Sequence, residues 1–210
     1  MKNLKWIFLT IALVVIIVGA SVVYDTYMKN NGGGLIPTET TPKDDLGESP
    51  KDDPTPSDKT NEPNDTPNTE KVTMSAPDFT VINYDGEEVK LSDYVGKPIV
   101  LNFWATWCVY CKMEMPDFNK AYENYPDVVF LMVNATDGHN ETVDTAKSYV
   151  ETEGFSFTVL FDTKGEAENA YHITGWPTTY FLNAKGDIVA RASGALSYET
   201  LEQGIAMIKE

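Results

Sequence analysis

The chain has 210 residues, 32 acidic and 16 basic side chains, and a net charge of −16. With a single arginine, Arg191, and no basic stripe, it lacks the features of nucleic-acid-binding proteins and of polybasic segments that adhere to anionic lipid. Its only two cysteines are Cys108 and Cys111. A disulfide between residues this close would close almost no loop and add little stability, so the pair predicts redox chemistry rather than a structural link.

An apolar segment begins the chain. Lys2 and Lys5 precede an uncharged run from Trp6 to Tyr24. As a helix this run would span about 28 Å, close to the thickness of a bilayer's hydrocarbon core. Lysines before the run and Asp25 after it favour a cytoplasmic amino terminus and an exported body. We expect residues 1–29 to be a retained transmembrane signal-anchor; a cleaved signal peptide is the alternative.

Residues 30–71 have a different composition. The segment has no aromatic side chain, carries seven prolines, and contains little aliphatic surface beyond Leu35, Ile36 and Leu46. Such a segment cannot bury enough apolar surface to offset the entropy cost of ordering. We expect a disordered linker over 30–71 and one folded domain over 72–210, which is long enough for a hydrophobic core.

The domain's hydrophobic pattern indicates alternating strands and helices. Asp85-Gly86 between the runs 79–83 and 87–91 indicates a β-hairpin, and the apolar run 98–105 is typical of a strand buried on both faces. The remaining elements predicted in chain order are a helix over 108–124 containing Pro116, a strand over 128–134, a helix over 141–153, a strand over 157–161, a hairpin of 178–183 and 187–192, and a last helix capped by Ser197. This order predicts a mixed sheet covered by helices.

The two cysteines lie where the first long helix should begin. Free backbone N–H groups and the helix dipole favour a thiolate at Cys108, and the thiolate is the attacking species in disulfide exchange. Cys111 follows one turn later on the same face, so it can resolve a mixed disulfide formed by Cys108. Half of a zinc site is the alternative, but the only histidines, His139 and His172, are far apart in sequence and are expected at the surface.

Three segments resemble the thioredoxin-like superfamily, and within it the membrane-anchored thiol–disulfide oxidoreductases of the TlpA/ResA type. Residues 102–116 resemble the active-site segment, residues 76–79 (Ala-Pro-Asp-Phe) the amino-terminal extension, and residues 175–182 (Gly-Trp-Pro-Thr-Thr-Tyr-Phe-Leu) the cis-proline strand. The resemblance implies an α/β thioredoxin-like fold: a mixed central sheet flanked by helices, with an N-terminal β-hairpin extension and a central insertion, preceded here by one transmembrane helix.

The resemblance also implies roles for individual residues near the cysteines. Pro177 would follow a cis peptide bond and face the cysteine pair, exposing the backbone before it to an extended substrate. Trp176 would form a wall beside the substrate, and Trp107 would shield the Cys108 sulfur. A plain proline at the start of a strand and ordinary core aromatics are the alternatives.

Glu114 carries the remaining catalytic expectation. It follows Cys111 by one helical turn, at the position where the TlpA/ResA-type branch has a glutamate, and would exchange a proton with the Cys111 sulfur. Thioredoxins usually place a buried Asp six residues before the first cysteine, where this chain has Asn102, which cannot titrate. An exposed helix glutamate is the alternative.

The implied function is reduction of disulfides in exported proteins, such as apocytochrome c, with the Cys108–Cys111 disulfide as the redox centre and no other cofactor. Its partners would be those proteins and an integral membrane thiol carrier of the CcdA/DsbD type as electron donor. The protein would be a monomer held in the cell membrane by its N-terminal helix, with the thioredoxin-like domain on the extracytoplasmic face.

Other functions remain as alternatives. Oxidation or isomerisation of exported proteins uses the same residues, because the direction depends on reduction potentials. A thiol peroxidase is disfavoured because Leu101 and Ala105 stand where a peroxide pocket would have Pro and Thr. A non-catalytic binding module is disfavoured by the intact cysteines.

Overall fold

The computed structural model describes residues 34–38 and 74–209, and a mixed β-sheet runs through this part of the chain. Its strands are β1 (Ile36–Pro37), β2 (Met74–Ser75), β3 (Thr80–Ile82), β4 (Glu88–Lys90), β5 (Ile99–Trp104), β6 (Val129–Asn134), β7 (Thr158–Phe161), β8 (Thr178–Leu182) and β9 (Asp187–Ser193). Its helices are the 3-10 helix η1 (Leu91–Tyr94) and the α-helices α2 (Val109–Asn124), α3 (Val143–Glu153), α4 (Glu166–Ala170) and α5 (Tyr198–Ile208). The sheet order is β1-β9-β8-β5-β6-β7-β3-β4, and β2 also pairs with β9.

Strand β5 is the buried centre of the sheet. It pairs in parallel with β6 and antiparallel with β8, and all of its residues are buried. Successive side chains of a strand point to opposite faces. Val100 and Trp104 therefore join one hydrophobic core, whereas Ile99, Leu101 and Phe103 join a second core on the other face.

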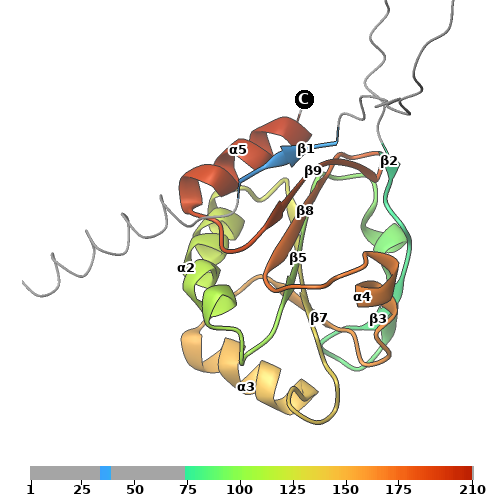
Figure 1. Cartoon of the computed structure of the whole chain (residues 1–210), viewed down its shortest axis with the longest axis vertical. Helices are drawn as coiled ribbons and strands as arrows, with labels where there is room; N and C mark the ends of the chain where they lie inside the picture. Colours follow the sequence, from blue (N-terminus) through green and yellow to red (C-terminus); the bar gives the residue numbers. More distant parts are fainter. Residues whose placement is uncertain (1–33, 39–73, 210) are drawn as a thin grey trace, which may run out of the picture.

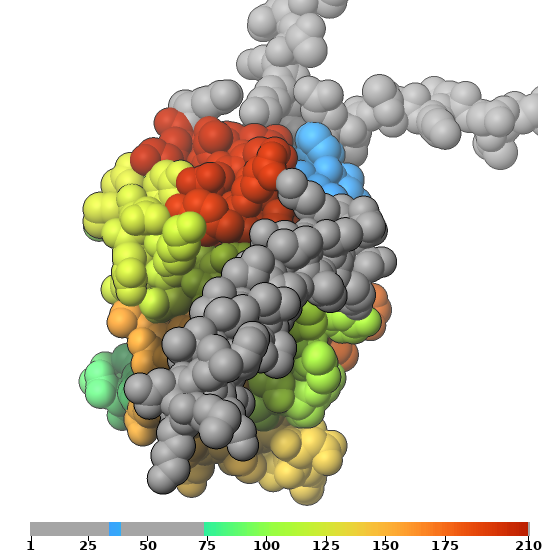
Figure 2. Space-filling view, turned by 90° about the vertical axis from the view of Figure 1, so that its left-hand side faces the viewer, coloured from blue at the N-terminus to red at the C-terminus, as the bar shows by residue number. Residues whose placement is uncertain are grey.

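Helices α2, α3 and α5 cover one face of the sheet, and α4 lies on the other (Figure 1). In the view of Figure 2 the red surface of α5 lies above the yellow-green surface of α2, and the gold surface of α3 lies at the opposite end. The β5-α2-β6 and β6-α3-β7 units both join parallel strands, and crossovers of one hand place their helices on the same face. Because α2 follows β5 directly in the chain, it begins at the carboxyl end of the central strand.

Most elements predicted from the sequence are confirmed, with bounds shifted by one or two residues. The helix predicted over 108–124 is α2, with Cys108 as its N-cap and Pro116 inside it. The first hairpin is β3–β4, and Ser197 caps α5 by accepting a hydrogen bond from the Thr200 backbone N–H. Helix α4 has only five residues, too few to give a periodic pattern in the sequence.

The disordered linker predicted over 30–71 needs a correction at residues 34–38. In β1, Ile36 pairs with Arg191 of β9, and both the backbone N–H and the hydroxyl of Thr38 donate to carbonyls of β9. The free edge of β9 offers hydrogen-bond partners, which offset the low apolar content of the segment. The rest of the predicted linker and the predicted signal-anchor over 1–29 lie outside the described residues. Within residues 34–38 and 74–209, no helix is long and apolar enough to cross a membrane.

Candidate functional site

Cys108 and Cys111 form a disulfide at the start of α2. Cys108 is the N-cap of this helix, and its Sγ accepts a 3.0 Å hydrogen bond from the Cys111 backbone N–H. Cys108 is 6% exposed and Cys111 is 0% exposed, so only the first cysteine contacts solvent. When the disulfide opens, the N–H groups at the helix start can stabilise a negative charge on the Cys108 sulfur.

Exposed apolar side chains lie next to Cys108 in the chain. Trp107, Val109 and Tyr110 are 49%, 62% and 49% exposed, which is unusual for large apolar residues. The ring of Trp107 meets the ring of Trp176 edge to face, with 5.3 Å between centroids. We call these four residues the apolar rim. A rim of this kind beside a reactive sulfur can bind an extended polypeptide.

The peptide bond between Trp176 and Pro177 is cis, so the alternative of a plain strand-start proline is wrong. Pro177 is buried, and its carbonyl accepts a hydrogen bond from the Gly194 backbone N–H after β9. Because Trp176 contacts Trp107, the cis-proline loop and the loop before Cys108 lie side by side. The structure thus brings together residues that are about seventy positions apart in the sequence.

Glu114 is fully buried, so the alternative of an exposed helix glutamate is wrong. Its Oε1 accepts a 2.8 Å hydrogen bond from the Asn102 side-chain amide, and its Oε2 accepts a 2.9 Å bond from the Leu196 backbone N–H. Burial raises the pKa of Glu114 to about 8, against the two hydrogen bonds, which lower it, and with a small further rise from Asp117. A carboxyl that titrates near neutral pH can both accept and donate a proton there.

Sequence reasoning missed Glu141, which it placed at the start of a helix. Helix α3 begins at Val143 with Thr142 as its N-cap, so Glu141 belongs to the loop after β6. Its side chain is fully buried and accepts hydrogen bonds from Thr106, two residues before Cys108. No local pattern distinguishes Glu141 from a surface glutamate, because its partner comes from a different loop.

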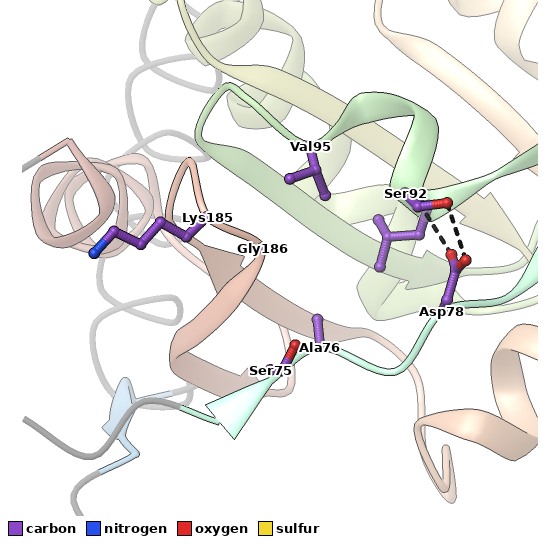
Figure 3. Close-up of a pocket in the computed structure, with 8 residues that line it drawn as sticks. Ser75, Ala76, Asp78, Ser92, Val95, Lys185 and Gly186 are labelled. Atoms are coloured by element: carbon purple, nitrogen blue, oxygen red, sulfur yellow. Dashed lines mark hydrogen bonds between the residues drawn. The ribbon is translucent and has the colours of Figure 1, made fainter.

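A separate hollow lies between β2, η1 and the β8–β9 turn, and the disulfide residues do not line it (Figure 3). In it Asp78 accepts hydrogen bonds from the backbone N–H and the hydroxyl of Ser92, at 3.0 and 2.9 Å. Figure 3 shows the Lys185 side chain pointing away from both residues. Asp78 thus links the segment before β3 to η1, which gives the Ala-Pro-Asp-Phe segment a structural role. The lining residues are Ser75, Ala76, Asp78, Leu91, Ser92, Val95, Lys185 and Gly186.

The mixed sheet, the disulfide at a helix start and the neighbouring cis-proline define a thioredoxin-like thiol–disulfide oxidoreductase. The chain belongs to the AhpC/TSA family, whose model matches residues 72–191. The thiol-disulfide oxidoreductase ResA of Geobacillus kaustophilus is 34% identical over 140 residues, which cover 66% of this chain and 78% of the relative. The thioredoxin-like protein YneN of Bacillus subtilis is 36% identical over 131 residues, which cover 62% of this chain and 76% of the relative.

Solved structures confirm the predicted α/β thioredoxin-like fold. A putative thiol:disulfide interchange protein DsbE from Chlorobium tepidum superimposes with a TM-score of 0.58 and 30% identity, covering 64% of this chain and 94% of that protein. StoA from Bacillus subtilis superimposes with a TM-score of 0.54 and 28% identity, covering 62% of this chain and 97% of that protein.

Proposed function

We propose that this oxidoreductase reduces disulfides of exported proteins, with Cys108 as the attacking thiol and Cys111 as the resolving thiol. The observation that carries this assignment is the difference in exposure between the two cysteines. A substrate can reach the Cys108 sulfur past the apolar rim, whereas Cys111 is closed off and can react only with a partner already bound to Cys108. The N-cap position of Cys108 supports the same order.

The reaction has two displacement steps. The Cys108 thiolate attacks one sulfur of the substrate disulfide, forms a mixed disulfide and releases the other substrate sulfur as a thiolate. The Cys111 thiolate then attacks the Cys108 sulfur, restores the Cys108–Cys111 disulfide and releases the second substrate thiolate. Two electrons pass from the protein's dithiol to the substrate, so an external dithiol must reduce the protein before the next cycle.

Glu114 is the proton acceptor in the second step of this proposal. A buried thiol cannot ionise easily, because its negative charge would be desolvated. Glu114 lies one helical turn beyond Cys111 and is buried with it, and its raised pKa suits a group that takes the Cys111 proton and later returns it. Reduction of the disulfide by the external donor uses the same proton in the opposite direction.

The apolar rim and Pro177 bind the substrate in this proposal. The touching rings of Trp107 and Trp176 form one apolar surface near the reactive sulfur, against which the peptide packs, and the backbone before Pro177 pairs with the peptide as an added strand. Exposed aromatic surface of this size favours an unfolded or extended polypeptide with apolar residues near its cysteines.

The cellular setting is proposed from the sequence and from the relatives. The N-terminal apolar run would anchor the protein in the cell membrane, with the described domain on the extracytoplasmic face. One similar structure is described as a pneumococcal exposed lipoprotein thioredoxin. An integral membrane thiol carrier of the CcdA/DsbD type would supply electrons, and exported proteins such as apocytochrome c would receive them.

Trapping in membranes tests this function. In full-length protein with Cys111→Ala, the mixed disulfide at Cys108 cannot be resolved, so substrates stay covalently attached and can be identified by mass spectrometry. The double variant Cys108→Ala, Cys111→Ala is the control and should capture nothing. Substrates that accumulate as disulfides in cells lacking the protein would support the reductive direction.

Two results would contradict the proposal. Capture of the same proteins by a Cys108→Ala variant would make Cys111 the attacking thiol. Trapped partners that accumulate as free thiols in cells lacking the protein would show that the pair oxidises its substrates.

A further inference from the structure

The loop between β5 and α2 places Cys108, and this loop is held by a residue from outside it. Within the loop, the Cys108 backbone N–H donates to the Ala105 carbonyl at 3.2 Å. The Thr106 backbone N–H donates to Glu141 Oε1 at 3.0 Å, and the Thr106 hydroxyl donates to Glu141 Oε2 at 2.5 Å. The backbone N–H and the hydroxyl of Thr106 therefore both donate to the carboxyl group of Glu141.

Glu141 is itself fixed through its side chain and its backbone. Its Oε1 also accepts a 2.7 Å hydrogen bond from the Asn134 amide at the end of β6. Its backbone N–H donates to Asp137 Oδ1 at 2.9 Å, and the same oxygen accepts from the backbone N–H groups of His139 and Asn140. The carboxyl of Glu141 is thus tied to the central parallel strands.

The chemistry of the three donors explains why a carboxylate occupies this buried place. Two N–H groups and one hydroxyl converge on Glu141, which is 0% exposed. Ionised carboxylates are acceptor-only groups, whereas a glutamine would turn an NH₂ group toward one of these donors. Burying a carboxylate costs free energy, and several hydrogen bonds are needed to offset this cost.

We propose that Glu141, acting through Thr106, is a positioning residue that keeps Cys108 at the N-cap of α2 when the protein is reduced. In the oxidised protein the disulfide already ties Cys108 to Cys111. In the reduced protein that covalent tie is gone, and the two hydrogen bonds from Thr106 to Glu141 still hold the loop from outside. This inference rests on the proposed role of Cys108 as the attacking thiol.

The position of the Cys108 sulfur matters because it must accept the hydrogen bond from the Cys111 N–H to be stabilised as a thiolate. A loop freed from Glu141 would let the sulfur leave this place, so less thiolate would be present at neutral pH and attack would slow. The other charged groups on the elements near Cys108 are Lys112, Glu114, Asp117, Lys120 and Glu123 of α2, Asp137 of the loop after β6, and Glu166 and Glu168 of α4. Unlike these groups, Glu141 accepts hydrogen bonds from both the backbone N–H and the hydroxyl of Thr106.

The test uses the purified full-length protein in its reduced form. The variants are Glu141→Gln, Thr106→Val, which removes only the hydroxyl donor, and Thr106→Ser, which keeps both donors. Glu153→Gln, at an exposed glutamate of α3, is the matched control. The measurements are the rate at which the protein reduces a model peptide disulfide and the ultraviolet absorbance of the thiolate at neutral pH, relative to Cys108→Ser.

Glu141→Gln should slow reduction about tenfold, and Thr106→Val about threefold, with a parallel loss of thiolate absorbance. In Thr106→Ser, the reduction rate and the thiolate absorbance should both equal those of wild type. Glu153→Gln should likewise change neither quantity. Should Glu141→Gln fail to fold, Thr106→Val carries the test, since this residue is only partly buried.

A lower melting temperature with unchanged rate and unchanged thiolate absorbance would overturn the inference and leave Glu141 a structural residue. An unaltered rate in Thr106→Val would also overturn it. Failure of the proposed function gives a different result, because Cys108→Ser would then keep its exchange activity.

Discussion

The side-chain amide of Asn102 donates a 2.8 Å hydrogen bond to the carboxyl of Glu114, and both side chains are fully buried. The same amide donates to the Thr179 hydroxyl on β8 at 3.0 Å, so it links the central strand, α2 and β8. Asn102 Oδ1 accepts no hydrogen bond from the described residues. Because Asn102 is neutral at every pH, Glu114 is the titrating member of this pair.

Replacement of Glu114 by Gln should remove a pH dependence of stability. Because the pKa of Glu114 is raised from 4.5 to about 8, the folded protein binds this proton more tightly than the unfolded chain. The contribution of Glu114 to stability is therefore present below about pH 4.5 and is lost as the pH rises to about 8, an effect on the order of 4 kcal/mol. Denaturant unfolding of the oxidised protein between about pH 5 and about pH 9 measures it.

The informative quantity is the difference in unfolding free energy between wild type and Glu114→Gln at each pH. A single curve of unfolding free energy against pH is not enough, because burial also raises the pKa of Asp162 and of Glu168. These groups affect wild type and Glu114→Gln alike. Parallel curves over the whole range would show that Glu114 titrates normally.

A second carboxyl beside Glu114 should destabilise the protein at neutral pH. Asn102→Asp replaces the amide that donates to Glu114 with a group that can itself become negative, and two adjacent carboxylates cannot both ionise readily. We expect the variant to lose about 2 kcal/mol or more of stability at neutral pH and to recover part of it in acid, where the pair holds a shared proton.

Unfolding at acidic and neutral pH measures this effect. Asn124→Asp, at the exposed end of α2, is the control and should stay close to wild type, because the Tyr198 hydroxyl that accepts from the Asn124 amide can instead donate to a carboxylate. Equal losses at both pH values would mean that the amide acts only as a packing group.

Loss of the Trp107 ring should affect large substrates and spare small ones. Trp107 is half exposed, so Trp107→Ala should change stability by only about 0.5 kcal/mol. The rate with a peptide disulfide should fall about tenfold, because the ring supplies contact area beside the reactive sulfur. The rate with glutathione disulfide should change little.

The ratio of the two rates is the measurement, and Val95→Ala, at another exposed apolar residue, is the control. An equal slowing with both substrates would indicate that Trp107 acts on the Cys108 sulfur and not on substrate binding.

Gly204 should tolerate no side chain, although it lies in the middle of α5. A Cβ at this position would collide with the ring of Phe181 on β8, which is itself fully buried. Alanine favours the helix by about 1 kcal/mol over glycine, but overpacking costs about 1–3 kcal/mol or more. We therefore expect Gly204→Ala to lower stability by about 2 kcal/mol.

The melting temperature of Gly204→Ala, compared with that of Gln203→Ala on the exposed face of the same helix, tests this expectation. An increase in stability would show that α5 can move away from the sheet at little cost.

The sequence predicted the parts of the site that depend on local pattern. Cys108 follows a buried strand and precedes a helical segment, so its N-cap position could be inferred from neighbouring residues. The cis bond before Pro177 could not be inferred in this way and came from the resemblance to thioredoxin-like proteins. The substrate-binding roles of Trp107 and Trp176 stay predictions.

The parts that escaped prediction depend on distant partners. Glu141 resembles a surface glutamate until the loops carrying Thr106 and Asn134 meet around it. Strand β1 is only two residues long and contains Pro37, and its pairing partner β9 lies about 150 residues later in the chain. Periodicity and composition describe one segment at a time. They therefore could not predict the burial of Glu141 or the pairing of β1 with β9, because each depends on a distant segment.

Both β1 and β2 pair with β9, so the described segments before and after residues 39–73 join the sheet along the same strand. A tensile load applied ahead of residue 34 would act first on β1. It would peel the bonds that Thr38 makes to the carbonyls of Ile188 and Val189. Strand β5, which leads into the redox pair, lies three strands further in. A load at the amino end would therefore break the pairing of Ile36 and Pro37 with β9 before it reached the strand that carries the redox pair.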